Sequence, residues 1–421
     1  MAYGFHVHPK EYTADVRGFS FVVERDGDLY KAYKSGKGLT FEDDDASAVI
    51  QSAMDVVSSE NGGVVLLKPA IYEITKTLVM KDYVVLKGEV SPVRQVTWSE
   101  QYVDRGAVLK LSDGANVPIV EAESGVKVRS IGLVDLVFDG NKDNQTEDVD
   151  VLYFYNGSEI LGLDIIRCKI FNGSRCGIYL RSVWKYKILH CEIAFNKAPG
   201  IYMTLLPDNG LVWGNIIHDN EGRGIDVYSN GAYLIIAHNH VHGNGYDGIR
   251  IKDTSYAIIQ GNHVMNNGIA SDNTYAGIVL ENSKYCIVSE NYVGTEDSID
   301  NRMKYAVIEF GDSDYNVISS ITYYRIGTLP ISFVGSHTRV IGVRGYRNSG
   351  VATFSGDGST TEFKIEHGLV KAPSKYGVSP LTPDAHADKT ISADDTYITI
   401  TFSTAPPSGT DNLKFSWWAE V

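Results

Sequence analysis

The sequence lacks long apolar runs, because no stretch reaches the roughly 18–20 consecutive apolar residues that a membrane-spanning helix requires. It also lacks an excess of basic residues, and its formal net charge at pH 7 is -14. An acidic chain is a poor ligand for nucleic-acid phosphates, which are bound by clustered Lys and Arg. We therefore expect neither a membrane nor a nucleic acid as a partner.

Cysteine is also scarce, and the four thiols contain no CxxC pair. They are Cys168, Cys176, Cys191 and Cys286. This spacing predicts buried free thiols and no zinc site. The opening MAYGFHVHPKEY has neither the basic nor the apolar region of a signal peptide. We expect an extracellular or virion-associated protein with no signal peptide in this chain, so that either a signal has been removed or export takes another route.

A repeat dominates the middle of the chain. The phrases GIYLRS, GIYMTL, GIDVYS, GIRIKD and GIVLEN begin at Gly177, Gly200, Gly224, Gly248 and Gly277, at intervals of 23, 24, 24 and 29 residues. Each phrase alternates apolar and polar residues, as a strand with one buried face does. Self-similarity with a period of about 20–30 residues is typical of a solenoid. Because every coil contains strands, the predicted fold is all-β, a parallel β-helix.

Polar side chains recur with the same period. Asn215, Asn239, Asn262 and Asn291 share one phase, and Asn196, Asn220, Asn244 and Asn267 share another. Amides stacked at coil spacing bond to one another and to the turn backbone, which predicts buried asparagine ladders. His218 and His242 share a turn phase, and His240 and His263 share an outward strand phase. No carboxylate recurs with these histidines, so we predict no metal site.

Composition divides the chain into three predicted parts. Residues 1–45 form a small N-terminal β module with a hairpin around Gly27. Residues 46–345 form the β-helix. Residues 346–421 contain alternating strands between turn clusters, which predicts a C-terminal antiparallel β-sandwich.

Two details of these parts are predicted more closely. An amphipathic helix capped by Asp44 or Asp45 and ended by Gly62 covers the open end of the first coil. In the last strand, alternation turns Trp417 and Trp418 to opposite faces, one into the sandwich core and one toward a subunit or a sugar.

Several stretches resemble a known group of proteins. VIQSAMDVVSSENGGVVLLKPAIYEITKTLVMKDYVVLKGE resembles the capping helix and first coils of the pectate-lyase-like superfamily. LVDLVFDGNKDN, the GI repeats, SDYNVISS and ISFVGSHTRVIG resemble the catalytic modules of mannuronan C5-epimerases and many viral and archaeal β-helix proteins, over about residues 45–345. The resemblance implies a right-handed parallel β-helix that acts on a polysaccharide.

The sequence departs from the epimerase pattern at one motif. The phrase YGFDPH of those enzymes, which supplies a tyrosine, an aspartate and a histidine for proton transfer, corresponds here to CGIYLR. Cys176, Tyr179 and Arg181 stand at the three positions. A similar phrase, YGFHVH from Tyr3 to His8, precedes the capping helix and lies on no coil.

The outward face of the repeated strands is the candidate site. If the isoleucines of the GI phrases point inward, the other face carries Tyr179, Arg181, Tyr202, Thr204, Asp226, Tyr228, Arg250, Lys252, Val279 and Glu281, with Glu309 following on the next coil. We predict Asp226, Tyr228, Arg250 and Lys252 as catalytic residues. We predict Tyr179, Arg181, Tyr202, Glu281 and Glu309 as substrate-binding residues.

These residue types suit proton abstraction at C5 of a uronic acid, which requires a base, a cation for the sugar carboxylate and a proton donor. Arg250 and Arg181 would hold the carboxylate. Lys252 or Tyr228 would exchange protons, because stacked cations lower the pKa of a lysine, and Asp226 would orient one of them. A lyase or C5-epimerase acting on a uronic-acid-containing polysaccharide is therefore the preferred function.

Three alternatives stay open. A tailspike-like glycoside hydrolase would take its acid and base from Asp226, Glu281 and Glu309. A non-catalytic spike or adhesin would stack sugar rings on the outward tyrosines. The charges would otherwise only solvate the face of a sheet. No cofactor is expected, although calcium would bind if those three carboxylates form one cluster. The aromatic terminal strand predicts a homotrimer or another homo-oligomer.

Overall fold

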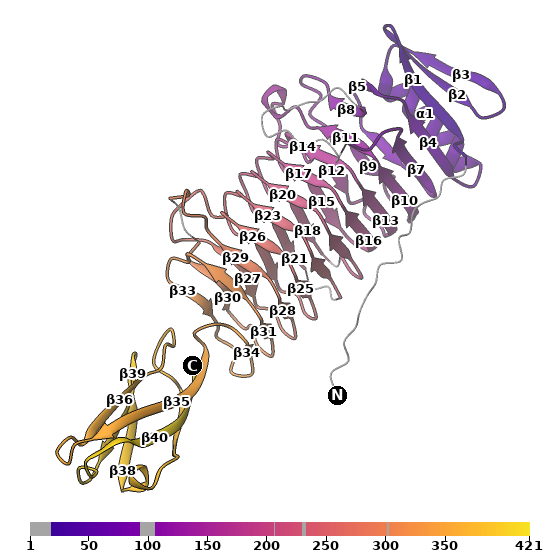
Figure 1. The fold of residues 1–421 in the computed structure, drawn as a ribbon. Coiled ribbons are helices and arrows are strands. Elements are labelled where there is room, and N and C mark those ends of the chain that lie inside the picture. The colour runs from indigo at the N-terminus through magenta and orange to yellow at the C-terminus, as the bar shows by residue number, and fades with distance from the viewer. Residues whose placement is uncertain (1–17, 93–105, 206, 230–232, 301–302) are drawn as a thin grey trace.

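The computed structural model describes residues 18–92, 106–205, 207–229, 233–300 and 303–421. Successive coils stack into a rod, and a set of antiparallel strands lies beyond its C-terminal end (Figure 1). The predicted all-β fold, a parallel β-helix with a capping helix and C-terminal antiparallel sheets, is confirmed. The phrase from Tyr3 to His8 lies outside the described residues.

Three long sheets form the sides of the rod, and neighbouring coils pair in parallel. Sheet A contains, in spatial order, β3 (Gly38–Asp43), β2 (Leu29–Lys34), β1 (Phe21–Asp26), β4 (Gly63–Leu67), β7 (Val84–Gly88), β10 (Val128–Val134), β13 (Ile160–Ile166), β16 (Val183–Leu189), β19 (Leu211–Trp213), β22 (Ile235–Ala237), β25 (Ile258–Gln260), β28 (Ile287–Ser289), β31 (Val317–Ser319) and β34 (Arg339–Ile341). Sheet B contains β32 (Thr322–Tyr324), β29 (Tyr292–Gly294), β26 (His263–Met265), β23 (His240–His242), β20 (Ile216–His218), β17 (Glu192–Ala194), β14 (Lys169–Phe171), β11 (Leu136–Asp139), β8 (Ala107–Leu111) and β5 (Ala70–Ile74). Sheet C contains β33 (Leu329–Ser332), β30 (Tyr305–Phe310), β27 (Ala276–Glu281), β24 (Ile249–Lys252), β21 (Ile225–Tyr228), β18 (Ile201–Thr204), β15 (Ile178–Arg181), β12 (Leu152–Phe154), β9 (Val120–Ala122) and β6 (Leu78–Met80).

The N-terminal end of the rod is closed by helix α1 (Ala46–Ser59) and by β1–β3. The Asp45 side chain accepts a hydrogen bond from the Ser47 backbone at 2.9 Å, which confirms the predicted N-cap. Gly62 and Gly63 follow the helix with φ values of 98° and 154°. The predicted hairpin is β1 and β2, and β1 also pairs in parallel with β4, so the hairpin continues sheet A.

The asparagine ladders are confirmed. Asn239 donates to Val212 O and Asn262 Oδ1, both at 3.0 Å, and its own Oδ1 accepts from the backbone and the amide of Asn215. The same pattern links Asn196, Asn220, Asn244 and Asn267 at the other corner. All eight asparagines are at most 1% exposed. The ladders therefore satisfy polar groups inside the turns and are not part of a binding surface.

The C-terminal strands form two three-stranded antiparallel sheets around a separate core that includes Phe402 and Phe415. The first sheet holds β35 (Arg347–Gly356), β40 (Gly409–Glu420) and β37 (Lys375–Pro380), and the second holds β36 (Glu362–Glu366), β39 (Tyr397–Phe402) and β38 (Lys389–Ala393). Two short 3-10 helices, η2 (Lys142–Asn144) and η3 (Pro383–His386), complete the described elements. Trp417 packs against the sandwich core and Trp418 is 42% exposed, as the alternation predicts.

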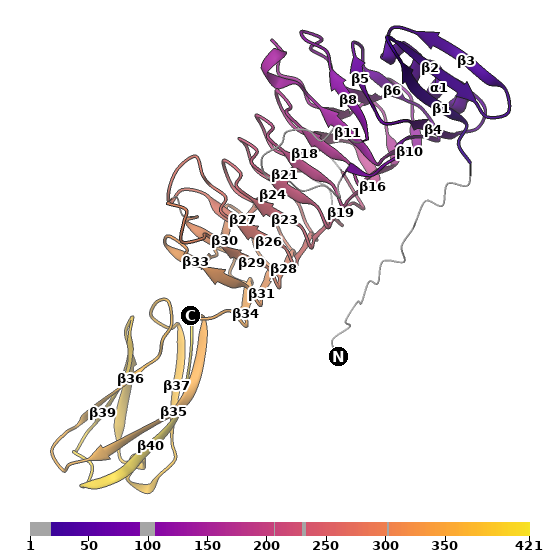
Figure 2. The same cartoon turned by 45° about the horizontal axis from the view of Figure 1, so that its top comes forward.

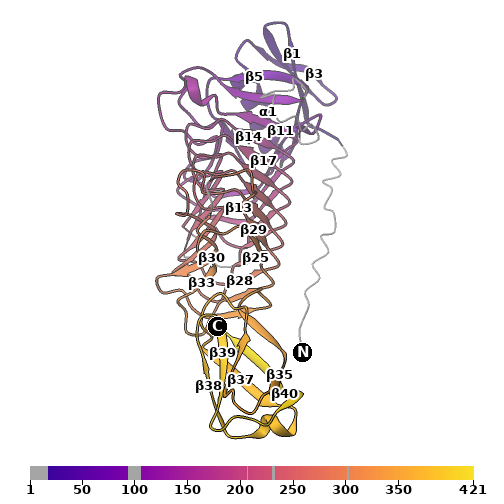
Figure 3. The ribbon, with the colours of Figure 1, turned by 60° about the vertical axis from the view of Figure 1, so that its left-hand side comes forward.

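The sandwich lies beyond the last coils, as two further views show (Figures 2 and 3). The chain ends at this junction, where the Val421 backbone donates to Tyr346 O at 3.0 Å. No helix in the described ranges is both long and apolar enough to cross a membrane.

Candidate functional site

The outward side chains of sheet C form two parallel columns along the rod. The first column contains Tyr153, Tyr179, Tyr202, Asp226, Arg250, Val279 and Ile308, and the second contains Arg181, Thr204, Tyr228, Lys252, Glu281 and Phe310. The isoleucines that directly precede the first column, such as Ile225 and Ile249, are fully buried. The register predicted from the GI phrases is therefore correct from β15 to β27.

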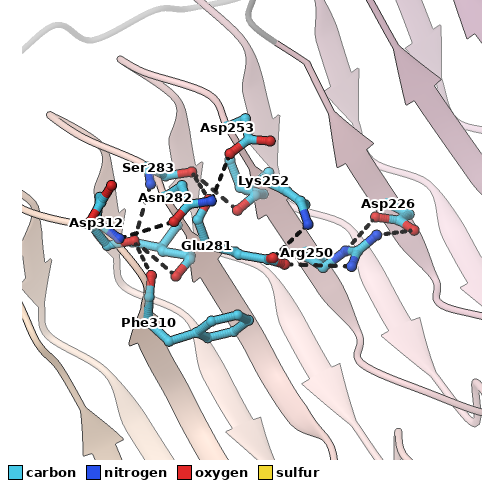
Figure 4. A network of polar contacts seen from close by, with 12 residues as sticks. Asp226, Arg250, Lys252, Asp253, Glu281, Asn282, Ser283, Phe310 and Asp312 are labelled. Atoms are coloured by element: carbon cyan, nitrogen blue, oxygen red, sulfur yellow. Dashed lines mark hydrogen bonds and ion pairs between the residues drawn. The ribbon is translucent and has the colours of Figure 1, made fainter.

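A chain of ion pairs crosses these columns (Figure 4). Arg250 donates to both oxygens of Asp226, from Nε at 2.8 Å and from Nη2 at 3.0 Å. Its Nη1 lies 3.6 Å from Glu281 Oε2, and Lys252 Nζ donates to Glu281 Oε1 at 2.6 Å. The two carboxylates thus fix a guanidinium and an ammonium at alternate, outward positions of one strand.

Two charged residues of this network were missed by the sequence analysis. Arg223 Nε donates to Asp247 at 2.8 Å, and Arg223 Nη1 lies 3.4 Å from Asp226. Both Arg223 and Asp247 directly precede a GI phrase, where the chain still turns and alternation does not predict direction. The signal that identifies them is their shared place immediately before Gly224 and Gly248.

Two hollows lie along this face and share Arg223 as a lining residue. The first, of about 320 Å³, is lined by Arg223, Asp247, Arg250, Thr274, Ala276, Val279, Glu281, Lys304, Tyr305, Ile308 and Phe310. The second, of about 280 Å³, is lined by Arg175, Cys176, Lys197, Ala198, Pro199, Tyr202, Gly222, Arg223, Asp226 and Tyr246. Each is near the lower limit of roughly 300 Å³ for small-molecule pockets. Lys304, another residue that the sequence analysis missed, lies with its ammonium 5.4 Å from the centre of the Tyr305 ring.

The outward tyrosines differ in what they offer a ligand. Tyr179 is 8% exposed between Tyr153 and Tyr202, whose ring centres lie 5.2 Å and 5.5 Å away. Its hydroxyl pairs with Thr204 Oγ1 at 3.0 Å. Tyr179 therefore has no free ring face for a sugar, contrary to the stacking role in the adhesin hypothesis. Tyr202 lines a hollow, and burial together with the charge of Asp226 raises its pKa.

The two arginines predicted to hold one carboxylate are not adjacent. Arg181 belongs to β15 and Arg250 to β24, with β18 and β21 between them. At a strand spacing of about 4.8 Å, two intervening strands separate them by roughly 14 Å. The Arg181 guanidinium instead stacks 4.3 Å above the Tyr155 ring, and Arg223 is the arginine that lies beside Arg250. The predicted joint role of Arg181 and Arg250 is thus wrong in its geometry.

The placement of Glu309 on the outward face is also wrong. Glu309 pairs in register with Leu280, and Phe310 pairs with Glu281. Glu309 is 1% exposed, and its Oε1 accepts hydrogen bonds from Asn316 Nδ2 at 2.7 Å and Thr338 Oγ1 at 2.9 Å. These donors stabilise a carboxylate inside the coil.

The chemistry expected of Lys252 is reversed by its neighbour on the next coil. The hydrogen bond to Glu281 raises the pKa of Lys252, and this effect exceeds those of burial and of the charge on Arg250, which both lower it. A lysine base at neutral pH requires the opposite shift. The raised pKa keeps Lys252 protonated at neutral pH, so it does not fit the predicted role of a base. The carboxylates named for calcium are not brought together either, because Glu309 points into the coil and Arg250 lies between Asp226 and Glu281.

The histidines lie on sheet B and not on the hollowed face. His240 and His263 pair in register on β23 and β26, with ring centres 4.7 Å apart, as their phase predicts. His218 stacks on His242 at 5.0 Å and contacts Asp219 and Glu192. In the described ranges, no group of three or more His, Cys, Asp or Glu side chains is arranged to hold a metal ion.

Comparison with known proteins places the chain among right-handed β-helices. Residues 150–295 match the family described as "Right handed beta helix region". The mannuronan C5-epimerase AlgE5 of Azotobacter vinelandii is 23% identical over 244 residues, which cover 53% of this chain and 23% of that protein. The chain spans a quarter or less of the length of the curated relatives that it matches.

Two solved structures have a similar fold. The A-module of the A. vinelandii mannuronan C-5 epimerase AlgE4 has a TM-score of 0.51 and 17% identity, covering 71% of this chain and 96% of the module. ORF18 of Geobacillus virus E2 has a TM-score of 0.58 and 13% identity, covering 91% of this chain and 85% of that one. The resemblance inferred from the sequence motifs is thus confirmed for the fold, which is a right-handed parallel β-helix.

Proposed function

We propose that the chain is a polysaccharide-active enzyme that removes the C5 proton of a uronate, as a lyase or a C5-epimerase. The observation that carries the proposal is the pair of guanidinium groups, Arg223 and Arg250, that line one hollow and are held in place by ion pairs with Asp247 and Asp226. A planar carboxylate is the ligand that such fixed guanidinium groups bind best. The epimerase relatives support the same substrate class.

The cations would act on the charge that develops during the reaction. When the C5 proton leaves, negative charge spreads onto the uronate carboxylate, and donors already fixed near it lower the barrier. Asp226 orients Arg250 through two hydrogen bonds, so the guanidinium needs no reorganisation. Lys304, at the same hollow, adds a third positive charge.

Proton transfer is assigned to the hydroxyls and the ammonium of the same face. Tyr228 is 46% exposed and lies beneath the Lys252 ammonium, which is 5.3 Å from its ring centre. We assign the exchange at C5 to Tyr228. Lys252 and Tyr202, whose raised pKa values keep both groups protonated at neutral pH, would give hydrogen bonds to the leaving oxygen or to the sugar.

A tailspike-like function is the second candidate. The likeness to the viral ORF18 covers 91% of this chain and hence includes coils and sandwich together, whereas the epimerase module covers 71%. In that case the same face would bind a polysaccharide for hydrolysis or adhesion, and the protein would be virion-associated. Extracellular location and assembly as a homotrimer or another homo-oligomer are proposed with either function.

The deciding experiment incubates the full chain with alginate, polygalacturonate, hyaluronan and a neutral galactomannan. A lyase produces the ultraviolet absorbance of a C4–C5 double bond, and an epimerase in D₂O incorporates deuterium at C5 without chain cleavage. New reducing ends without a double bond identify a hydrolase and would overturn the proposal. Binding without any product supports the adhesin.

A further inference from the structure

The C-terminal sandwich carries an exposed indole on the outer face of its first sheet. Trp418 is 42% exposed, whereas its neighbour Trp417 packs into the sandwich core. Trp418 lies on the central strand β40, and its partners in register are Ser349 on β35 and Gly377 on β37. The indole is therefore surrounded by the sheet on both sides and is not at an edge.

Gly377 makes room for this indole. A Cβ atom at Gly377 would come within 2.6 Å of Trp418 Nε1 and 3.0 Å of Cε2, so the indole lies directly over the glycine. Any larger residue at position 377 would displace the ring. The glycine thus seats the indole against β37, which leaves the side away from the sheet open to solvent.

The residues around the indole are small or charged. On the same face, two rows of residues across the sheet flank the row of Trp418. One row contains Arg347, Glu420 and Lys375, and the other contains Val351, Ser416 and Ser379. In these two rows only Val351, which is 65% exposed, is a large apolar residue, and Leu381, which is 54% exposed, follows opposite Lys414. A stable protein interface buries roughly 1,200–2,000 Å² around a dehydrated apolar centre, which this face does not provide.

We propose that Trp418 is a carbohydrate-binding platform that stacks on the apolar face of a pyranose ring within a polysaccharide. One rigid aromatic ring matches the C–H face of a single sugar, and the surrounding hydroxyl, guanidinium, ammonium and carboxylate groups match the sugar hydroxyls at its rim. The platform belongs to the sandwich and does not use the hollows of sheet C. It therefore holds whether or not the function proposed above is correct.

The test is affinity electrophoresis, which measures how strongly gels containing alginate, polygalacturonate, hydroxyethylcellulose or galactomannan retard the full chain. Trp418→Ala is expected to weaken retardation by at least one of these polymers by about five- to tenfold, the loss of one aromatic contact. Val351→Ala, an apolar truncation on the same face, is the matched control and is expected to match the wild type. Gly377→Ala keeps the indole but displaces it, and is expected to weaken binding as well.

Light scattering of the same variants separates the competing explanation. The proposal requires Trp418→Ala to keep the molecular mass of the wild type. A smaller assembly would show that the indole contacts a second copy and would overturn the proposal, as would unchanged retardation by all four polymers. In the Arg250→Ala variant, Trp418→Ala should still weaken retardation, because binding at Trp418 does not use the hollows of sheet C.

Discussion

Polar side chains form ladders in two regions of this molecule, and the two ladders are built differently. The asparagine ladders in the corners repeat one residue at coil spacing, and each amide satisfies the next. The outward columns of sheet C change residue at almost every coil, from tyrosine to aspartate to arginine, and border two hollows. A repeated asparagine is satisfied by the same residue on the next coil, whereas the different charged residues of the columns form ion pairs with one another beside the hollows.

Removing the guanidinium at the centre of the columns is expected to give the largest effect. Arg250→Ala should lower turnover by about 10²–10³-fold, with a smaller loss in binding, because the lost donor acts mainly on developing charge. Arg167→Ala is the matched control. Arg167 makes the same two-fold contact with a buried aspartate, Asp135, at 2.7 Å and 2.9 Å, but at a corner of the rod away from both hollows. Equal activity of the two variants on the identified substrate would contradict the site.

Breaking an asparagine ladder should act on stability alone. Asn239→Leu removes the acceptor of the Asn215 backbone N–H and amide and the amide that donates to Val212 O and Asn262 Oδ1, so we expect the free energy of unfolding to fall by about 3 kcal/mol. Urea unfolding measures this loss. Turnover per folded molecule should be unchanged, and a loss of turnover without destabilisation would mean that the ladder serves the site.

Glu281 and Glu309 compare an outward with an inward carboxylate. They lie one residue apart in the register of β27 and β30, because Glu309 pairs with Leu280 and not with Glu281. Glu309→Gln places an amide donor among the donors around Glu309 and should reduce stability by about 2 kcal/mol without changing turnover. Glu281→Gln frees Lys252 and loosens Arg250, so turnover should fall by about 10- to 100-fold with little loss of stability. Chemical unfolding and initial rates of both variants give the readout. If the two effects are exchanged, the register of β30 is wrong.

The contact between His218 and Glu192 predicts a pH dependence of stability on sheet B. Burial lowers the pKa of His218, but hydrogen bonds to Asp219 and Glu192 outweigh it and raise the pKa above 6.5. Burial raises the pKa of Glu192, but His218 and Lys169 outweigh it and lower the pKa below 4.5. The contribution of His218 to the free energy of unfolding is complete below pH 6.5 and is lost as the pH rises through the pKa of His218 in the folded protein. The contribution of Glu192 is complete above pH 4.5 and is lost as the pH falls through the pKa of Glu192 in the folded protein.

Both contributions to stability are therefore complete between about pH 4.5 and pH 6.5. His218→Gln should therefore reduce stability by about 1 kcal/mol in this window and by less above and below it. Thermal unfolding across pH 3.5–9 (roughly the range that spans both pKa values) measures the difference from the wild type. A difference that is constant with pH would show that His218 contributes through packing alone.

The smallest effects are expected from His240→Ala and His263→Ala. Both rings lie on sheet B, away from the columns of sheet C, so turnover should change by less than about twofold. Each variant loses ring contacts of the stack, which are worth roughly 0.5 kcal/mol or more. A large loss of turnover in either variant would move the site to sheet B.

Much of this arrangement follows from periodicity. The GI phrases gave the correct register from β15 to β27, the asparagine phases gave both ladders, and alternation gave the opposite directions of Trp417 and Trp418. These predictions succeed because a strand has a period of two and each coil repeats the position of the last.

The predictions are wrong where a residue on another coil determines the direction or the charge of a side chain. The alignment of AVIEFG with GIVLEN already pairs Glu309 with Leu280, but a charged residue was expected outside. Its stability inside depends on Asn316 and Thr338, which come from later in the chain. The pKa of Lys252 depends in the same way on Glu281. Periodicity gives the position of a side chain, but it does not give the partners that set its charge.

The coil-to-coil pairing also affects how the chain reaches its fold. Residues that pair in neighbouring coils are close in sequence, as Ile225 and Ile249 are, 24 residues apart in a chain of 421. This separation is about 0.06 of the chain length, below the roughly 0.16–0.22 of all-β sandwiches and barrels and close to that of helical bundles. Each coil pairs with the one before it, as β21 pairs with β24, and α1 with β1–β3 closes the N-terminal end. Folding kinetics should therefore reflect the pairing of neighbouring coils, with a rate set by adding one coil and not by closing a long-range sheet.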